Sequence, residues 1–399
     1  MHSRYQRVCR FTALAIALLA APALAKDKVV AAPINMDAPP SAAFTDSNAA
    51  LLSGTKRVAI TSVVICFQSS TGARAGASFF LPVLTSRAEV MSVLAMPGMS
   101  TDLQDALAAN AYNALAEQLK AQGFEVVPQD QVRASANYQA ILKQGGYANH
   151  SRFANAMGDI ELVGPEGLPT YTAYHGELGN FHYPGKSYMG WADGFGLKSI
   201  TPGGPSYVQM GGAWKVPGLE VALAKELNAH VVKAYYVVSL GKTDARRSTD
   251  FAVKQGWGEL SKYPSLGNVG TYTAIERTVT GKGTALAQVG LVQDQSRISF
   301  RTPTGNAKWQ KVSMIAGTPA PKDGDVVIHL ASPLYGGTDF FSVSEGQIPR
   351  QGGGMFSSQQ KADITVGFVA RVSDPLGYGK EVSGMIASAS KAMLELVKQ

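Results

Sequence analysis

The chain has 399 residues, of which 45% are hydrophobic and 16% are charged, and its formal net charge is +7. This balance excludes an intrinsically disordered chain and leaves enough apolar residues for a sizeable core. The basic residues are dispersed and are not interleaved with aromatic residues, so the positive charge does not indicate a protein that binds nucleic acid.

The first 25 residues have the pattern of a secretory signal peptide. Three arginines precede an apolar run over residues 11–19, and Ala23-Leu24-Ala25 has the small residues of a cleavage site. We therefore expect residues 1–25 to be removed and the mature chain to be exported, to the periplasm or outside the cell. The apolar run is too short to cross a bilayer, and no later stretch approaches eighteen apolar residues, so the sequence predicts no transmembrane helix.

The cysteine content predicts a chain without an internal disulfide. One of the two cysteines, Cys9, lies in the signal peptide, so the mature chain keeps Cys66 alone. Cys66 stands inside an apolar run, where a lone cysteine usually behaves as a small buried hydrophobic residue.

Residues 26–54 contain Pro39-Pro40 and have no sustained period, so we expect a flexible leader on the surface. Residues 55–144 form the first α/β half, in which residues 56–67 are a β-branched run typical of a strand covered on both faces. A loop over 69–76 and an irregular, packed stretch over 78–99 follow. Further along we expect a helix over 101–122, a strand over 124–128 and a helix over 129–142.

Residues 145–217 form an insertion rich in glycine and aromatic residues, with no helical period. Long loops of this kind are usually functional or mobile, and exposed aromatic side chains suit a contact with a protein or a glycan. The alternative is that they fold back as a small satellite core. As partner-binding candidates we single out Tyr174, Tyr183, Tyr188, Trp191 and Trp214.

Residues 218–399 form the second half, which starts by repeating the first. Residues 114–121 and 222–229 share five of eight residues, and both segments precede a strand, the second over 230–240. A helix between two strands of one sheet makes the strands parallel. The helix predicted here spans 218–228, and a closing helix spans 379–397. The strands predicted between them are 272–280, 285–292, 297–301, 309–315, 326–330 and 362–372.

The predicted fold is therefore α/β to α+β: a layered sheet with helices 101–122, 129–142, 218–228 and 379–397, and a strand-rich second half. Thr280-Gly-Lys-Gly283 and the Gly-Lys-Thr of residues 241–243 both have the composition of turns.

Few patterns in the sequence point to chemistry. His175, Glu177 and His182 are weak candidates for zinc ligands, and the alternative is that they are solvent-exposed polar residues in a loop. The Gly-Lys-Thr after the strand lacks the leading glycine of a phosphate-binding loop, and there is no Gly-x-Ser-x-Gly motif. The sequence thus predicts no cofactor and no catalytic residue, and it favours a protein without enzymatic activity.

Three segments carry a resemblance to the curli secretion-channel (CsgG-like) family and to the amino-terminal domain of the TolB translocation protein. These are residues 56–60, residues 114–127, and residues 227–232 with 235–238. The resemblance implies a periplasmic, non-enzymatic α/β domain in envelope assembly or transport. The curli channel family is lipid-anchored through a cysteine just after its signal peptide, and this chain departs from it because Lys26 follows Ala25 with no cysteine nearby. It also lacks, in residues 145–214, the clean alternation of transmembrane hairpins. Channel formation is therefore not part of what the resemblance implies here.

The leading hypothesis is an exported, non-catalytic α/β protein that binds an envelope protein or glycan through residues 145–214. A role in outer-membrane assembly, secretion or transport, and a homo-oligomer, are compatible with it. Two alternatives remain open: an exported hydrolase with a cleft between the two halves, and a glycan- or small-molecule-binding module that uses Trp191 and Trp214 for stacking.

Overall fold

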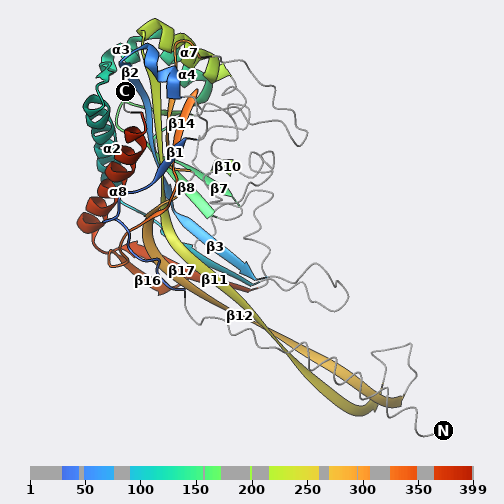
Figure 1. The fold of residues 1–399 in the computed structure, drawn as a ribbon. Coiled ribbons are helices and arrows are strands. Elements are labelled where there is room, and N and C mark those ends of the chain that lie inside the picture. Colours follow the sequence, from blue (N-terminus) through green and yellow to red (C-terminus); the bar gives the residue numbers. More distant parts are fainter. Residues whose placement is uncertain are drawn as a thin grey trace, which may run out of the picture.

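The computed structural model describes residues 29–44, 49–75, 90–155, 158–171, 198–199, 215–259, 269–293, 295–305, 324–347 and 364–397. Within these ranges the chain is a mixed α/β structure built on one large sheet of eleven strands (Figure 1). This confirms the predicted fold class.

The spine of the large sheet runs in the order β1-β14-β13-β11-β2-β8-β7-β10. Strands β5, β12 and β15 pair at its sides. The strands are β1 (Ala42–Phe44), β2 (Arg57–Gln68), β5 (Glu125–Val126), β7 (Ser151–Asn155), β8 (Gly158–Val163), β10 (Lys198–Ser199), β11 (His230–Glu259), β12 (Val269–Leu291), β13 (Arg297–Arg301), β14 (Val326–Leu330) and β15 (Leu334–Tyr335).

A smaller sheet has the order β16-β17-β4-β3, with β3 (Ser70–Ala75), β4 (Val90–Ala95), β16 (Phe341–Glu345) and β17 (Ile364–Val372). A third sheet pairs β6 (Gly146–Tyr147) with β9 (Thr170–Tyr171). The described part of the insertion therefore contains short strands, although the sequence predicts mostly loop there.

The two halves of the chain meet in the large sheet, where β2 and β11 are parallel neighbours from His230↔Val58 to Val238↔Phe67. Strand β5 also runs parallel to β2. This is the arrangement predicted from the repeated helix and strand, because a crossover helix returns the chain in the same direction. The ten residues from Val58 to Phe67 are all buried, as expected for a strand covered on both faces.

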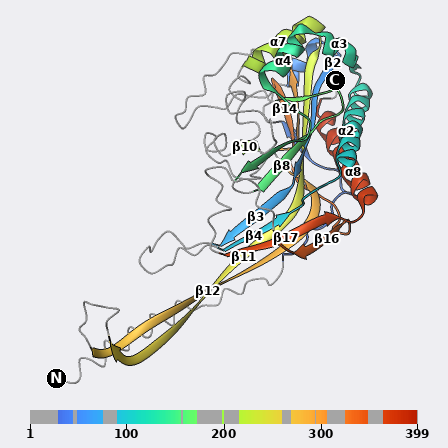
Figure 2. The same cartoon turned by 180° about the vertical axis from the view of Figure 1, so that it is seen from behind.

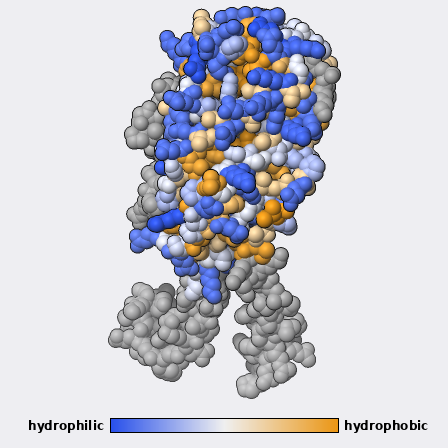
Figure 3. All heavy atoms as spheres, turned by 90° about the vertical axis from the view of Figure 1, so that its left-hand side faces the viewer, coloured by the Kyte–Doolittle hydropathy of each residue, from blue (hydrophilic) through white to orange (hydrophobic). Residues whose placement is uncertain are grey.

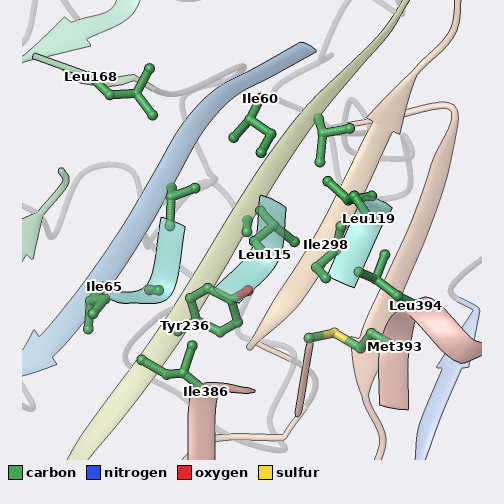
Figure 4. Packing of buried hydrophobic residues seen from close by; sticks show 14 of the residues in the cluster. Ile60, Ile65, Leu115, Leu119, Leu168, Tyr236, Ile298, Ile386, Met393 and Leu394 are labelled. Carbon is green, nitrogen blue, oxygen red and sulfur yellow. The ribbon is translucent and has the colours of Figure 1, made fainter. Parts of the chain in front are cut away.

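Helices α2 (Thr101–Ala121) and α8 (Pro375–Glu395) lie side by side on one face of the large sheet (Figures 1 and 2). The apolar residues of α2 at helical spacing are buried toward the sheet, and so are Ile386 and Met393 of α8 (Figure 4). On the outer surface of this layer, apolar and hydrophilic residues alternate (Figure 3).

The predicted helix over 129–142 is in fact two helices, α3 (Gln129–Ala134) and α4 (Ala136–Gly145). Ser135 separates them in an extended conformation, and its hydroxyl accepts the backbone N–H groups of Asn137 and Tyr138. A serine that caps a following helix in this way ends the preceding one. Helix α4 packs against α7 (Val216–Leu227) at the end of the sheet far from the projecting strands (Figure 1).

Helix α8 begins at Pro375, four residues before the predicted start at Gly379. The Asp374 carboxylate caps it by accepting the backbone N–H of Gly377, and a proline suits the first helical position.

The predicted leader contains two short ordered elements that the sequence analysis does not predict. Residues 42–44 form β1, which pairs with β14 in antiparallel register, and residues 49–54 form the short helix η1 (Ala49–Gly54). The side chain of Asn35 is also tied to the backbone of Pro333 and Tyr335. A proline-rich segment can therefore be ordered by pairing with a sheet edge, which its own sequence does not reveal.

The predicted loop over 69–76 is wrong, because Ser70–Ala75 is strand β3. The stretch over 78–99 contains β4, which pairs antiparallel with β3 and parallel with β17. The predicted strand over 309–315 lies outside the described residues.

Two glycine-containing segments that are predicted to be turns lie inside long strands. The predicted turn at Thr280–Gly283 lies within β12, which continues from Val269 to Leu291. A Cβ atom at Gly281 would crowd Val90 and Ile364 of the smaller sheet, and one at Gly283 would crowd Ser92 and Val366. These glycines therefore allow close approach of two sheets and do not form a turn.

The Gly-Lys-Thr segment is likewise not a turn at the end of a strand. It lies within β11, at a register shift between Ser239 and Gly241 in the pairing with β12. Gly241 has a φ of 144°, and a Cβ atom there would meet the backbone carbonyl of Leu286. The shift is a β-bulge that only glycine can occupy without strain.

We expect Gly241→Ala to destabilise the protein by about 2 to 3 kcal/mol, because alanine is strained at this φ and clashes with the facing strand. The same change at Gly218 in α7 is the control, since nothing lies within 4 Å of a Cβ atom there. Gly218→Ala should stabilise by about 0.5 to 1 kcal/mol, as alanine does within helices. Urea unfolding of both variants measures the difference, and an equal effect would contradict the assignment of the bulge.

His230, the first residue of β11, provides a second test through pH. The side chain is buried, and its Nε2–H donates to the carbonyls of Leu52 (3.3 Å) and Thr55 (3.1 Å). Burial lowers the pKa of His230 below its ordinary value of 6.5, although the two carbonyls oppose the shift.

Because the folded-state pKa is the lower one, the folded protein favours the neutral imidazole, and the resulting stabilisation is complete above about pH 6.5. It is lost as the pH falls through the folded-state pKa. We expect His230→Gln, which keeps a donor but does not titrate, to depend less on pH in that window. Urea midpoints between pH 5 and 8 measure this. Parallel curves for the two proteins would rule out the contribution of His230.

Candidate functional site

The residues selected from the sequence as a site all fall outside the described residues. They are the partner-binding candidates Tyr174, Tyr183, Tyr188, Trp191 and Trp214 and the metal-ligand candidates His175, Glu177 and His182. Their roles stay predictions. The described residues offer three other features: a projecting arm, a buried ionic cluster and a surface pocket.

The arm consists of residues 248–259 of β11 and 269–280 of β12. The two segments pair with each other from Ser248↔Thr280 to Glu259↔Val269. At about 3.3 Å per residue, twelve residues extend about 40 Å. The arm projects from the body as a two-stranded ribbon (Figures 1 and 2).

Both outer edges of the arm lack a strand partner within the described part of the chain. Strand β11 pairs with β2 only as far as Val238 and with β13 only as far as Tyr235. Strand β12 pairs with β15 only at Gly290 and Leu291. An unpaired edge presents backbone N–H and C=O groups that can bind a strand of another chain.

Apolar and polar residues alternate along part of the arm. Apolar residues occur at the odd positions Phe251, Val253 and Trp257. The backbone register sets these opposite Arg277, Ile275 and Thr271, so the odd positions are partly apolar. Positions that face each other in an antiparallel pair share a face of the ribbon. The opposite face carries mainly the polar or small residues at even positions. This period of two was the available signal for a long hairpin.

The buried ionic cluster consists of Glu220, Lys233, Arg301 and Asp325. The Glu220 carboxylate of α7 lies 3.0 Å from Lys233 Nζ of β11 and 3.2 Å from Arg301 Nε of β13. Arg301 also contacts Asp325, 3.2 Å away. Each of the four side chains is at most 10% exposed.

Tyr171 of β9 completes this cluster. Its hydroxyl donates to Glu220 Oε1 (3.1 Å) and lies 2.7 Å from the hydroxyl of Thr61 in β2. Burial, and then the charge of Glu220, raise the pKa of Tyr171 well above its usual value, so the hydroxyl keeps its proton. The cluster thus links α7, β2, β9, β11 and β13. Because its side chains are buried, dissolved molecules do not reach them. Its arrangement suits a structural tie between the two halves.

Cys66 lies on the same strand as Thr61 and is buried, as the sequence predicts. Burial raises the pKa of its thiol, which holds it in the unreactive protonated form.

The surface pocket has a volume of about 320 Å³ and lies between the start of α2 and the loop from β8 to β9. Asp105 and Glu166 supply its carboxylates. Its other lining residues are Ala148, Asn149, Pro165, Gly167, Leu168 and Pro169.

Two neighbouring side chains hold the carboxylate of Asp105 in one orientation. Asp105 Oδ1 lies 3.1 Å from Asn149 Nδ2 and 3.0 Å from His150 Nε2. The other ring nitrogen of His150 lies 3.1 Å from Glu161 of β8. Both nitrogens of this imidazole are thus used by carboxylates, and the described residues contain no group of three or more His, Cys, Asp or Glu side chains placed to bind a metal.

Comparisons with known proteins add no relative: no family model matches the chain, and neither a curated protein nor a solved structure matches it. Among the helices in the described ranges, none combines the length and the apolar character required to cross a membrane.

The buried ionic cluster predicts that a single substitution in it lowers the free energy of unfolding strongly. We expect Glu220→Gln to destabilise the protein by about 3 to 5 kcal/mol, because it removes the carboxylate that Lys233 and Arg301 share and leaves Asp325 as the one acidic group of the cluster. The control is Glu125→Gln, which breaks the surface ion pair with Arg57, where the side chains are 65% and 33% exposed. Such a pair contributes at most about 1 kcal/mol. Denaturant unfolding of both variants measures the contrast, and similar losses would contradict a structural tie.

Proposed function

We propose that this chain is an exported, non-catalytic envelope protein and that its arm binds another protein of the envelope. The observation that carries this proposal is the two-stranded arm, which leaves the body and has two edges without strand partners within the described residues.

Physical chemistry supports the arm as a contact surface. A two-stranded hairpin is at best marginally stable alone in water, and proteins usually protect exposed strand edges. An arm of about 40 Å is therefore costly to maintain unless it gains partners. A partner strand would satisfy the backbone groups at an edge, and the face with Phe251, Val253 and Trp257 would give such a partner an apolar surface.

The resemblance to the curli secretion-channel family supports a role in outer-membrane secretion or transport. That family has hairpins with alternating side chains. The arm is a hairpin of residues 248–259 and 269–280, outside the insertion, with a partial alternation of apolar and polar residues. The signal-like first 25 residues support export on the same grounds as before. The aromatic residues of the insertion remain predicted contact residues for the same partner.

The proposal is tested by replacing residues 248–280 with an Asn-Gly turn that joins Arg247 to Gly281, which face each other in register. Asn-Gly suits a two-residue hairpin turn. We expect the variant to keep its cooperative unfolding and to lose the envelope proteins that the intact chain retains in a pull-down. A folded variant that retains the same partners would refute the arm as the contact.

Photo-crosslinking locates the contact more directly. A photoreactive residue at position 253, in the arm, should give adducts with an envelope protein in the cells that produce the chain. The control is the same residue at the exposed position Lys120 of α2, on the body. The same set of adducts from both positions would count against the proposal.

A further inference from the structure

The pocket between α2 and the β8–β9 loop is independent of the arm. We propose that it binds a primary ammonium group carried on an alkyl stem, as in a lysine side chain or an alkylamine. This inference goes beyond the proposed function and does not rest on it.

The size of the pocket suits such a group. Its volume of about 320 Å³ lies at the lower end of the range for small-molecule sites. Leu168, which is buried, and the two prolines Pro165 and Pro169 provide apolar surface for methylene groups.

The charge of the pocket favours a cation. Asp105 Oδ1 is occupied by Asn149 and His150, which hold the carboxylate in one orientation. Oδ2 of Asp105 has no hydrogen-bond partner within the described ranges, and Glu166 has no ion-pair partner there. Two carboxylate groups beside an apolar floor match an ammonium head on an alkyl stem, since a charged acceptor strengthens the hydrogen bond.

The loop itself is preorganised for a ligand. Asn149 Oδ1 accepts the backbone N–H of Gly164 at 2.8 Å, which ties the two walls of the pocket together. His150 has a φ of 59° and Gly167 a φ of 69°, so both walls turn sharply at the pocket. The Arg133 guanidinium packs against Gly167, and Arg133 does not line the pocket.

The test is a ligand-observed NMR titration of the mature chain with n-pentylammonium and, as the neutral counterpart, n-pentanol. We expect saturable binding of the ammonium with a dissociation constant below about 10 mM and binding of the alcohol at least tenfold weaker, the factor for 1.4 kcal/mol. The affinity for the ammonium should fall as salt rises from 0.05 to 0.5 M, because these carboxylates are partly exposed.

Three variants locate the site. Glu166→Gln and Asp105→Asn should each weaken the ammonium at least fivefold. The matched control is Asp102→Asn, one turn earlier in α2, which removes the same charge from the same helix outside the pocket lining. Glu166 is exposed, so its variant tests the site without a risk to folding. No saturable binding, or equal losses in Asp102→Asn and Glu166→Gln, would overturn the inference.

A blocked Ala-Lys-Ala peptide, with norleucine in place of lysine as its control, distinguishes the two sources of the ammonium group. Tighter binding of the lysine peptide than of n-pentylammonium supports a polypeptide ligand, and the reverse order supports a free amine. The variant without the arm should bind like the intact chain, so the outcome is independent of the proposed function.

Discussion

The parallel pairing of β2 with β11 is the interaction on which the rest of the structure depends. It joins residues that are 172 positions apart at His230 and Val58, and helices and loops of both halves pack around it. Closing such a long connection has a large entropic cost before any contact forms. The cost is offset by burial on both sides, since every residue from Val58 to Phe67 is buried. The strand pair is therefore also the centre of the core.

The buried ionic cluster makes this pairing specific. Lys233 lies in β11 next to the bulge at Thr61 of β2, and both side chains contact or approach Tyr171 of β9. A shift of β11 by one residue would move Lys233 to the other face of the sheet and leave Glu220 without its partner. Buried charges contribute little net stability, but they penalise the wrong register strongly.

The sequence predicts those elements whose signals are local. The strand over 56–67, the helix over 101–122 and the strands 297–301 and 326–330 agree with the structure to within a residue or two, because each has a clear period and ends at residues that favour a turn or cap. The parallel arrangement of the two halves follows from the repeat. Elements set by distant partners were missed, as β1 and β3 show, since the order of each depends on a neighbouring strand.

Glycine explains the largest error, the division of one hairpin into several short strands. In sequence, Gly241, Gly281 and Gly283 look like breaks, but their role depends on which backbone or sheet lies opposite, which no local pattern contains. The pocket could not be predicted from the sequence for the same reason. The pocket combines Asp105 of α2 with Glu166 of a loop 61 positions later, and only the fold brings them together.

The arm and the body are connected through β11 itself, and this connection determines what the arm can do. A two-stranded hairpin is at best marginally stable alone in water. The part of β11 that lies in the body, the root of the arm, pairs with β2 and β13 and contributes Lys233 to the ionic cluster. At Gly281 and Gly283, β12 lies close to the smaller sheet. The rigid root fixes the register of the first pairs of the arm, and each later pair extends an existing ladder. Under the proposed function, an arm that is already held in an extended form would lose less entropy on binding its partner, and the contact would be stronger for it.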